Sequence, residues 1–282
     1  MYVQQRKGEL KMNYIEMFCE LSTNNENTKT AYHTDLTQMA EYIGKDVLYI
    51  DEFDMVSYKK YIEQFSSASR ARKLGVVKRF FEFLKENNKI DTNPAHLLKA
   101  PKVVNKTEET LSKDEVRAMI AASKNKRDAA IITTLAQTGM RVSELINIKV
   151  EDIDENHNVE IIGKGSKRRT IHFNDTVMKA INNYLAVRKN GCDFLFVSNQ
   201  GTQMSPRALN NTLKVIGKRV GVENVHNHAL RHYYATELLD SGVPITSIAS
   251  SMGHSSCMVT ERYARIRDKV AVATELMEME LV

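Results

Sequence analysis

The sequence has little of what marks secreted or membrane proteins. Its three cysteines, Cys19, Cys192 and Cys257, are odd in number and widely spaced. This pattern is typical of free thiols in a reducing compartment and not of a disulfide framework. No segment approaches the ~18 consecutive apolar residues of a membrane-spanning helix, and the opening residues lack the apolar run of a signal peptide. We therefore expect a cytoplasmic protein that does not insert into a membrane.

A large excess of charge of one sign is also missing. The chain has 40 Lys and Arg against 35 Asp and Glu, which gives a net charge of +5. A polyanionic partner is permitted but not required, because many soluble enzymes are equally basic. Hydrophobic residues make up 42% and no tract is of low complexity, so we expect a folded protein. Its 282 residues suffice for one large domain or two ordinary ones.

Apolar spacing predicts that the first part of the chain is helical. Tyr32, Leu36, Met39 and Ile43 follow one another at intervals of four, three and four residues, the stripe of an amphipathic helix. A second stripe follows in residues 72–87, and its basic residues lie mostly on other faces. These cations form either a solvated face or a surface for DNA phosphates. The phosphate-binding candidates are Arg72, Lys73, Lys78 and Arg79.

Prolines are scarce, and two of the four, Pro94 and Pro101, fall close together. Polar residues without an apolar period follow them, which predicts an interdomain linker. We place the linker at residues 104–110, between a helical domain at 1–103 and a second domain at 111–282.

The second domain is predicted to be mainly helical with a small antiparallel sheet. Ser112 to Glu115 has the spacing of a capping box that opens a helix, and an apolar helix before Gly139 is expected to stop at that glycine. The runs NVEIIG and RRTIHF flank a glycine-containing turn and predict a hairpin. Further helical patterns occupy residues 176–189, 205–221 and 228–242.

Several polar residues stand where an apolar pattern would not place them. Glu144 follows Arg141 by three positions, and Arg231 follows His228 by three, so on a helix His228 and Arg231 share a face. The remaining members of the set are Lys164 in the hairpin turn, and His254 and Tyr263 near the end of the sequence.

Phosphoryl transfer uses groups of these types. A planar guanidinium can meet two non-bridging oxygens at once, which lysine does less well. Acid and base groups each contribute roughly 10²- to 10⁴-fold. A tyrosine, whose pKa is ordinarily about 10, becomes a nucleophile if an imidazole or a cationic field removes its proton. Taken singly, Tyr263 is more often a packing residue, because the chain has 11 tyrosines. Spacing alone does not show that the set converges.

Four motifs occur together in one order: TGMRVSELINIKVEDID, IIGKGSKRRTIHF, HALRHYYATELLDSG and GHSSCMVTERY. In order and spacing they resemble the tyrosine recombinase (phage integrase) family. NTKTAYHTDL and TNPAHLLKAPKV resemble the N-terminal domain of its Xer-type and mobile-element members. The resemblance implies a mainly α fold, with a SAM-like helical core-DNA-binding domain followed by a mainly helical catalytic domain that carries the small sheet.

The resemblance also implies a site-specific recombinase or integrase that cleaves and rejoins DNA. Tyr263 would attack the scissile phosphate, form a 3′-phosphotyrosyl link and free a 5′-hydroxyl. Arg141 and Arg231 would hold the non-bridging oxygens, helped by His254.

Three further roles follow from the same motifs. Lys164, which matches the Gly-Lys-Gly position, would protonate the leaving oxygen, and His228 would assist as the base on Tyr263. Glu144 would be the supporting acidic residue. The hairpin of the family approaches DNA, so its other cations contact phosphate if they do not simply form a solvated turn. These are Lys167, Arg168 and Arg169.

We expect no cofactor and no metal. The phosphodiester is exchanged and not hydrolysed, so its energy is kept in the protein link. His228 and His232 have an i, i+4 spacing, but Ala229 stands where a metalloprotease helix needs Glu. The implied partners are double-stranded DNA recombination sites and three further copies in a tetramer on DNA. The residues after Tyr263 would dock either on a neighbouring protomer or on their own protomer.

Two rival functions remain at this stage. A type IB topoisomerase would use the same residues to relax DNA, and a catalytically inactive DNA-binding protein would use none of them for chemistry. The target sequence, and the choice between integration, excision and chromosome-dimer resolution, cannot be read from the residues.

Overall fold

The computed structural model describes residues 13–102, 110–162, 168–189, 191–223 and 225–253. The chain divides into two compact units, residues 1–106 and residues 107–282. Most of the expected linker lies outside the described residues.

No helix in the described ranges is both long and apolar enough to cross a membrane. Cys19 and Cys192 are free thiols.

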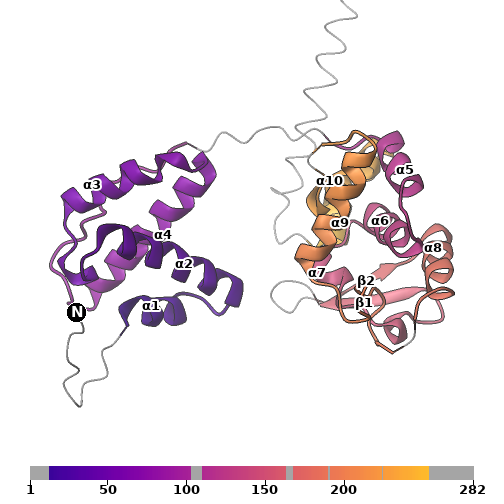
Figure 1. The fold of residues 1–282 in the computed structure, drawn as a ribbon, viewed down its shortest axis with the longest axis horizontal. Coiled ribbons are helices and arrows are strands. Elements are labelled where there is room, and N and C mark those ends of the chain that lie inside the picture. Colours follow the sequence, from indigo (N-terminus) through magenta and orange to yellow (C-terminus); the bar gives the residue numbers. More distant parts are fainter. Residues whose placement is uncertain (1–12, 103–109, 163–167, 190, 224, 254–282) are drawn as a thin grey trace, which may run out of the picture. The chain divides into compact units, whose positions relative to one another are not determined.

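All the regular secondary structure in the described residues of the first unit is helical (Figure 1). Asn25, Asp51 and Ser66 cap three of its helices by accepting backbone N–H groups of the first turn. Its α-helices are α1 (Tyr14–Ser22), α2 (Glu26–Ile43), α3 (Glu52–Tyr61) and α4 (Ser67–Glu86), with 3₁₀ turns η1 (Val47–Tyr49) and η2 (Ile62–Gln64).

All four α-helices of this unit contribute to its core. Leu36 and Met39 of α2 are fully buried, as the predicted stripe requires. The stripe of α4 is confirmed as well, because its apolar residues face the same core. These are Leu74, Val77, Phe81 and Leu84.

The second unit is a helical bundle with one small sheet (Figure 1). The predicted capping box at Ser112 and Glu115 is present, and Pro206 occupies the first turn of its helix. The elements are α5 (Lys113–Ala121), α6 (Lys126–Thr138), α7 (Val142–Leu145), η3 (Val150–Asp152), β1 (Asn158–Ile162), β2 (Arg168–His172), α8 (Asp175–Leu185), α9 (Pro206–Arg219), α10 (Asn227–Asp240) and α11 (Ile245–Met252).

Helix α6 is the centre of the second unit. It packs against α5, α8 and α10, and most of its residues are buried because its apolar positions run around the whole helix. Strands β1 and β2 pair antiparallel, with Val159 opposite Ile171, which confirms the predicted hairpin. The mainly α fold with a small antiparallel sheet is thus confirmed. Elements α6, α7, β2, α10 and α11 bring together four of the predicted site residues, Arg141, Glu144, Arg169 and Arg231.

Candidate active site

The site begins where α6 ends. Gly139 has a φ of 59°, and the chain turns there into Arg141, which stands at the N-cap position of the short helix α7. A Cβ at Gly139 would lie 2.2 Å from the Cδ1 atom of Tyr234, so both the backbone conformation and the close approach require glycine. The helix stop predicted at Gly139 is confirmed.

Glu144 holds the start of α7. Its Oε2 accepts the backbone N–H of Arg141 at 2.7 Å, and its Oε1 accepts from the guanidinium of Arg141 at 2.9 Å. The Glu144 side chain is only 5% exposed, whereas that of Arg141 is 30% exposed. Arg141 is therefore anchored on one side and reaches solvent on the other.

Arg169 of β2 binds the same carboxylate. Its two terminal nitrogens donate to Oε1 and Oε2 of Glu144 at 2.9 and 2.8 Å. Burial alone would raise the pKa of Glu144, but hydrogen bonds from Arg169 and from the Arg141 backbone outweigh it and hold that pKa below its ordinary value. Glu144 is thus a buried carboxylate anion at neutral pH.

This geometry gives no support to the prediction that Arg169 contacts DNA phosphate. Its side chain is 13% exposed and both terminal nitrogens face Glu144. Arg168, its neighbour on β2, is exposed and pairs with Glu160 of β1 at 3.0 Å, so phosphate contact stays a prediction for Arg168.

Arg231 reaches the same place from α10. The residue is 4% exposed, and its guanidinium donates to the carbonyl oxygens of Gly139 and Met252. Arg141 donates to the carbonyl of the next residue, Gly253, at 3.2 Å. The two guanidiniums therefore meet consecutive carbonyls at the end of α11, immediately before His254 in the sequence.

His228 lies in the first turn of α10, one turn before Arg231, and it is exposed whereas Arg231 is buried. The ring centroid of His226 is 6.1 Å from that of His228. His226 caps the helix, because its Nδ1 accepts the backbone N–H of Ala229 at 3.2 Å. The imidazole predicted to act as a base is therefore at the surface.

The remaining catalytic candidates, Lys164, His254 and Tyr263, lie outside the described residues, as does Lys167. Tyr233 and Tyr234, the tyrosines closest in sequence to Arg231, pack against apolar clusters, as expected for core residues. Within the described ranges, no group of three His, Cys, Asp or Glu side chains is arranged to hold a metal ion.

In the first unit, Lys73 is enclosed in the same way. The residue is 6% exposed, and its ammonium donates to Oδ1 of buried Asp35 at 2.9 Å and also to Gln38. It also lies 4.9 Å from the ring centroid of Phe65. This arrangement gives no support to phosphate contact by Lys73, because the charge is enclosed and already paired.

The other three basic candidates of α4 reach the surface to different degrees. Arg72 pairs with Asp35 but stays 48% exposed. Arg79 is exposed and donates to the hydroxyl of Tyr32 at 2.6 Å, and Lys78 donates to a backbone carbonyl at 3.2 Å. Phosphate contact stays a prediction for these three.

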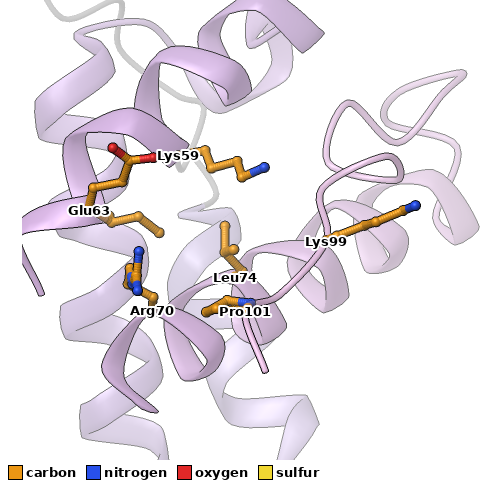
Figure 2. Close-up of a pocket in the computed structure, with 7 residues that line it drawn as sticks. Lys59, Glu63, Arg70, Leu74, Lys99 and Pro101 are labelled. Atoms are coloured by element: carbon orange, nitrogen blue, oxygen red, sulfur yellow. The ribbon is translucent and has the colours of Figure 1, made fainter. Parts of the chain in front are cut away.

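A basic pocket of about 200 Å³ was missed by the sequence reasoning (Figure 2). Lys59 of α3, Arg70 of α4 and Lys99 bring three cations to it, against one carboxylate, that of Glu63. These residues come from separate elements and share no motif, so no local signal marked them.

Comparison with known proteins decides the class. A family model described as "Phage integrase family" matches residues 109–269, and one described as "Phage integrase, N-terminal SAM-like domain" matches residues 13–88. The chain belongs to the phage integrase family. The tyrosine recombinase XerC of Staphylococcus epidermidis is 31% identical over 260 residues, which cover 86% of this chain and 88% of the relative. The XerC of Staphylococcus aureus is 32% identical, with 86% and 87% covered.

Solved structures agree with this assignment. The XerA recombinase is 27% identical, with a TM-score of 0.53, over 92% of this recombinase and 97% of XerA. The XerH site-specific recombinase bound to palindromic difH substrate has a TM-score of 0.73 at 21% identity, over 94% and 84% of the two chains. The latter likeness shows the fold. The expected class is confirmed: the protein is a site-specific tyrosine recombinase, and neither rival function is favoured.

Proposed function

We propose that this recombinase breaks and rejoins DNA strands through a covalent tyrosine link, with Tyr263 as the nucleophile. The observation that supports it best is the meeting of Arg141 and Arg231 at the carbonyls of Gly253 and Met252. Two planar guanidiniums at one place match the non-bridging oxygens of a single phosphate, on which negative charge develops in the transition state.

The proposed step exchanges one ester for another. The phenolic oxygen of Tyr263 forms a bond to phosphorus while the bond from phosphorus to the 5′-oxygen breaks. His228 takes the phenolic proton, and Lys164 gives a proton to the leaving oxygen. The products are a 3′-phosphotyrosyl link and a free 5′-hydroxyl. Attack by a 5′-hydroxyl from another duplex reverses the step and completes strand exchange.

The remaining parts of the set support this chemistry. Arg141 and Arg231 hold the two non-bridging oxygens, helped by His254. Glu144 is proposed to act only by holding Arg141, because its buried carboxylate faces arginines. The number of phosphodiester bonds is the same before and after, so the scheme consumes no ATP.

We also propose the substrate and the assembly. XerH and the Tn1549 transposon integrase were solved in complexes with DNA, at 21% and 20% identity to this chain. By analogy with these proteins, the recombinase is proposed to act on double-stranded recombination sites, and to do so as a tetramer. The residues after Tyr263 would then dock either on a neighbouring protomer or on their own protomer. Residues 1–103 bind the core DNA, residues 104–110 link the domains, and residues 111–282 catalyse.

The exposed cations of the first unit support its proposed role. Arg72 and Arg79 of α4 present charge at the surface, and Lys59 and Arg70 line the basic pocket. Phosphate contacts release counterions, so binding should weaken steeply with salt.

The test uses DNA that the protein itself selects from a random duplex library. A nicked duplex that carries the selected site traps the covalent intermediate, because the short leaving strand diffuses away. The wild type is expected to form an SDS-stable adduct, and Tyr263→Phe is expected to form none. Tyr234→Phe is the matched control: it keeps the ring beside Gly139 and should form the adduct.

The outcomes separate the candidate functions. Strand exchange between two site-bearing duplexes supports a recombinase. Relaxation of supercoiled plasmid without site preference supports a topoisomerase. Binding without any adduct from the wild type contradicts the proposed chemistry. An adduct that survives Tyr263→Phe shows that the nucleophile is another residue.

A further inference from the structure

One buried carboxylate in the second unit holds two arginines. Glu144 accepts the backbone N–H of Arg141 at 2.7 Å and its guanidinium at 2.9 Å. It also accepts two hydrogen bonds from Arg169, at 2.9 and 2.8 Å. The two guanidiniums carry two positive charges and Glu144 carries one negative charge. The group of three side chains therefore keeps one positive charge.

Arg169 also borders the segment that Arg141 reaches. A Cβ at Gly253 would lie 2.7 Å from Nη1 of Arg169, and Gly253 has a φ of 64°. The carbonyl of the same glycine accepts from Arg141 at 3.2 Å. Arg169 thus links three parts of the site: the start of α7, strand β2 and the end of α11.

The two arginines share the carboxylate of Glu144: Arg169 donates to both oxygens, whereas the guanidinium of Arg141 donates to Oε1 alone. A carboxylate forms its strongest pair with a guanidinium when both oxygens accept from it in a two-bond fork. Arg169 takes that fork, so Arg141 keeps one side-chain bond to Glu144 and directs another nitrogen to Gly253. Without Arg169, Glu144 would close a two-bond fork on Arg141 and neutralise it.

We propose that Arg169 is a positioning residue of the recombinase, which occupies Glu144 and thereby leaves Arg141 free to bind the scissile phosphate. This inference rests on the proposed function, because it assumes that Arg141 holds a phosphate oxygen. Arg169 itself touches neither DNA nor the reacting atoms in this scheme. Its effect is on the rate of cleavage and not on the affinity for uncleaved DNA.

The first test compares Arg169→Gln with Arg127→Gln. Arg127 of α6 is a matched control, because its side chain is 14% exposed, against 13% for Arg169, and it also pairs with a carboxylate, that of Asp128. Arg127 donates to Val197 and Asn199, away from the site residues. We expect Arg169→Gln to slow single-turnover adduct formation roughly 10- to 100-fold with little change in DNA affinity. Arg127→Gln should lower thermal stability without a comparable loss of rate.

The second test is a rescue that a merely structural role does not predict. In the Arg169→Gln background, Glu144→Gln removes the charge that would neutralise Arg141. The double variant is therefore expected to cleave faster than Arg169→Gln alone. If Arg169 only stabilises the fold, the double variant is less stable and cleaves more slowly. Should Arg169→Gln fail to fold, Arg169→Lys, which cannot form the two-bond fork, takes its place in the same comparison.

Each result has one meaning. If the wild type forms no adduct, the proposed function fails. If the wild type forms the adduct and Arg169→Gln forms it at the same rate, the proposed function stands and this inference is wrong. A double variant slower than Arg169→Gln also overturns the inference, as does an equal loss of rate in Arg127→Gln.

Discussion

The guanidinium of Arg231 donates to the carbonyl of Met252, the last residue of α11. A second bond from the same side chain goes to Gly139, at the end of α6. One buried arginine therefore ties together the ends of two helices that are 113 residues apart, between positions 139 and 252. The two roles of this arginine, packing and phosphate binding, can be separated experimentally.

Arg231→Lys should reduce both stability and cleavage. Lysine keeps the charge but cannot reach two carbonyls in the planar geometry of arginine. We expect a loss of at least about 100-fold in the rate of adduct formation, typical of a lost donor to a developing oxyanion. The thermal midpoint should fall as well. A cleavage rate equal to that of the wild type in a folded Arg231→Lys variant would argue against phosphate binding by Arg231.

Gly139→Ala should destabilise the second unit more than Gly242→Ala does. Both glycines have positive φ, 59° and 80°, so alanine costs about 1–2 kcal/mol of backbone strain at either site. Only Gly139 adds a collision, because its Cβ would lie 2.2 Å from Tyr234, whereas nothing lies within 4 Å at Gly242. Denaturant unfolding gives the two free energies of unfolding. Equal losses would contradict the close approach of Tyr234 to Gly139.

Glu144 should make the stability of the second unit sensitive to acid. Its folded-state pKa is below the ordinary value, because hydrogen bonds from Arg169 and Arg141 outweigh burial. The stabilisation is therefore complete above the ordinary pKa of Glu and is lost as the pH falls through the depressed one. In the wild type, the free energy of unfolding should therefore fall as the pH is lowered from about 7 to about 3, and in Glu144→Gln this fall should be smaller. An equal fall in the wild type and in Glu144→Gln would be inconsistent with a lowered pKa of Glu144.

Asp35→Asn should destabilise the first unit strongly. The substitution leaves Lys73, which is 6% exposed, without its buried anion, and removing one partner of a buried pair costs about 3–5 kcal/mol. Glu20→Gln is the control, because the Glu20 side chain that pairs with Lys29 is 67% exposed, and ion pairs open to solvent contribute little. Unfolding of both variants by denaturant measures the difference. A small effect of Asp35→Asn would show that Lys73 moves out to solvent.

Much of this architecture could be predicted from local pattern. The spacing of Leu36 and Met39 placed α2 on the core, and the glycine at 139 correctly marked the end of α6. Pairings between distant residues could not be predicted. Lys73 and Asp35 are 38 residues apart, and Arg169 and Glu144 are 25 apart.

Periodicity states only which face of an element a side chain occupies, and a basic residue on the polar face normally reaches solvent. A buried carboxylate on a distant element reverses that outcome, because the cation gains a partner where water is excluded. For this reason the pattern did not distinguish the enclosed cations of Lys73 and Arg169 from exposed ones. The motif residues Arg141 and Arg231 were found through their resemblance to a family and not through spacing.

The most direct test of the covalent mechanism is to map the adduct. Wild-type protein trapped on the nicked duplex is digested with protease and nuclease, and the modified peptide is sequenced by mass spectrometry. We expect the nucleotide on the peptide that contains Tyr263, attached through its 3′-phosphate. A nucleotide on any other residue, or one attached through a 5′-phosphate, would contradict the mechanism.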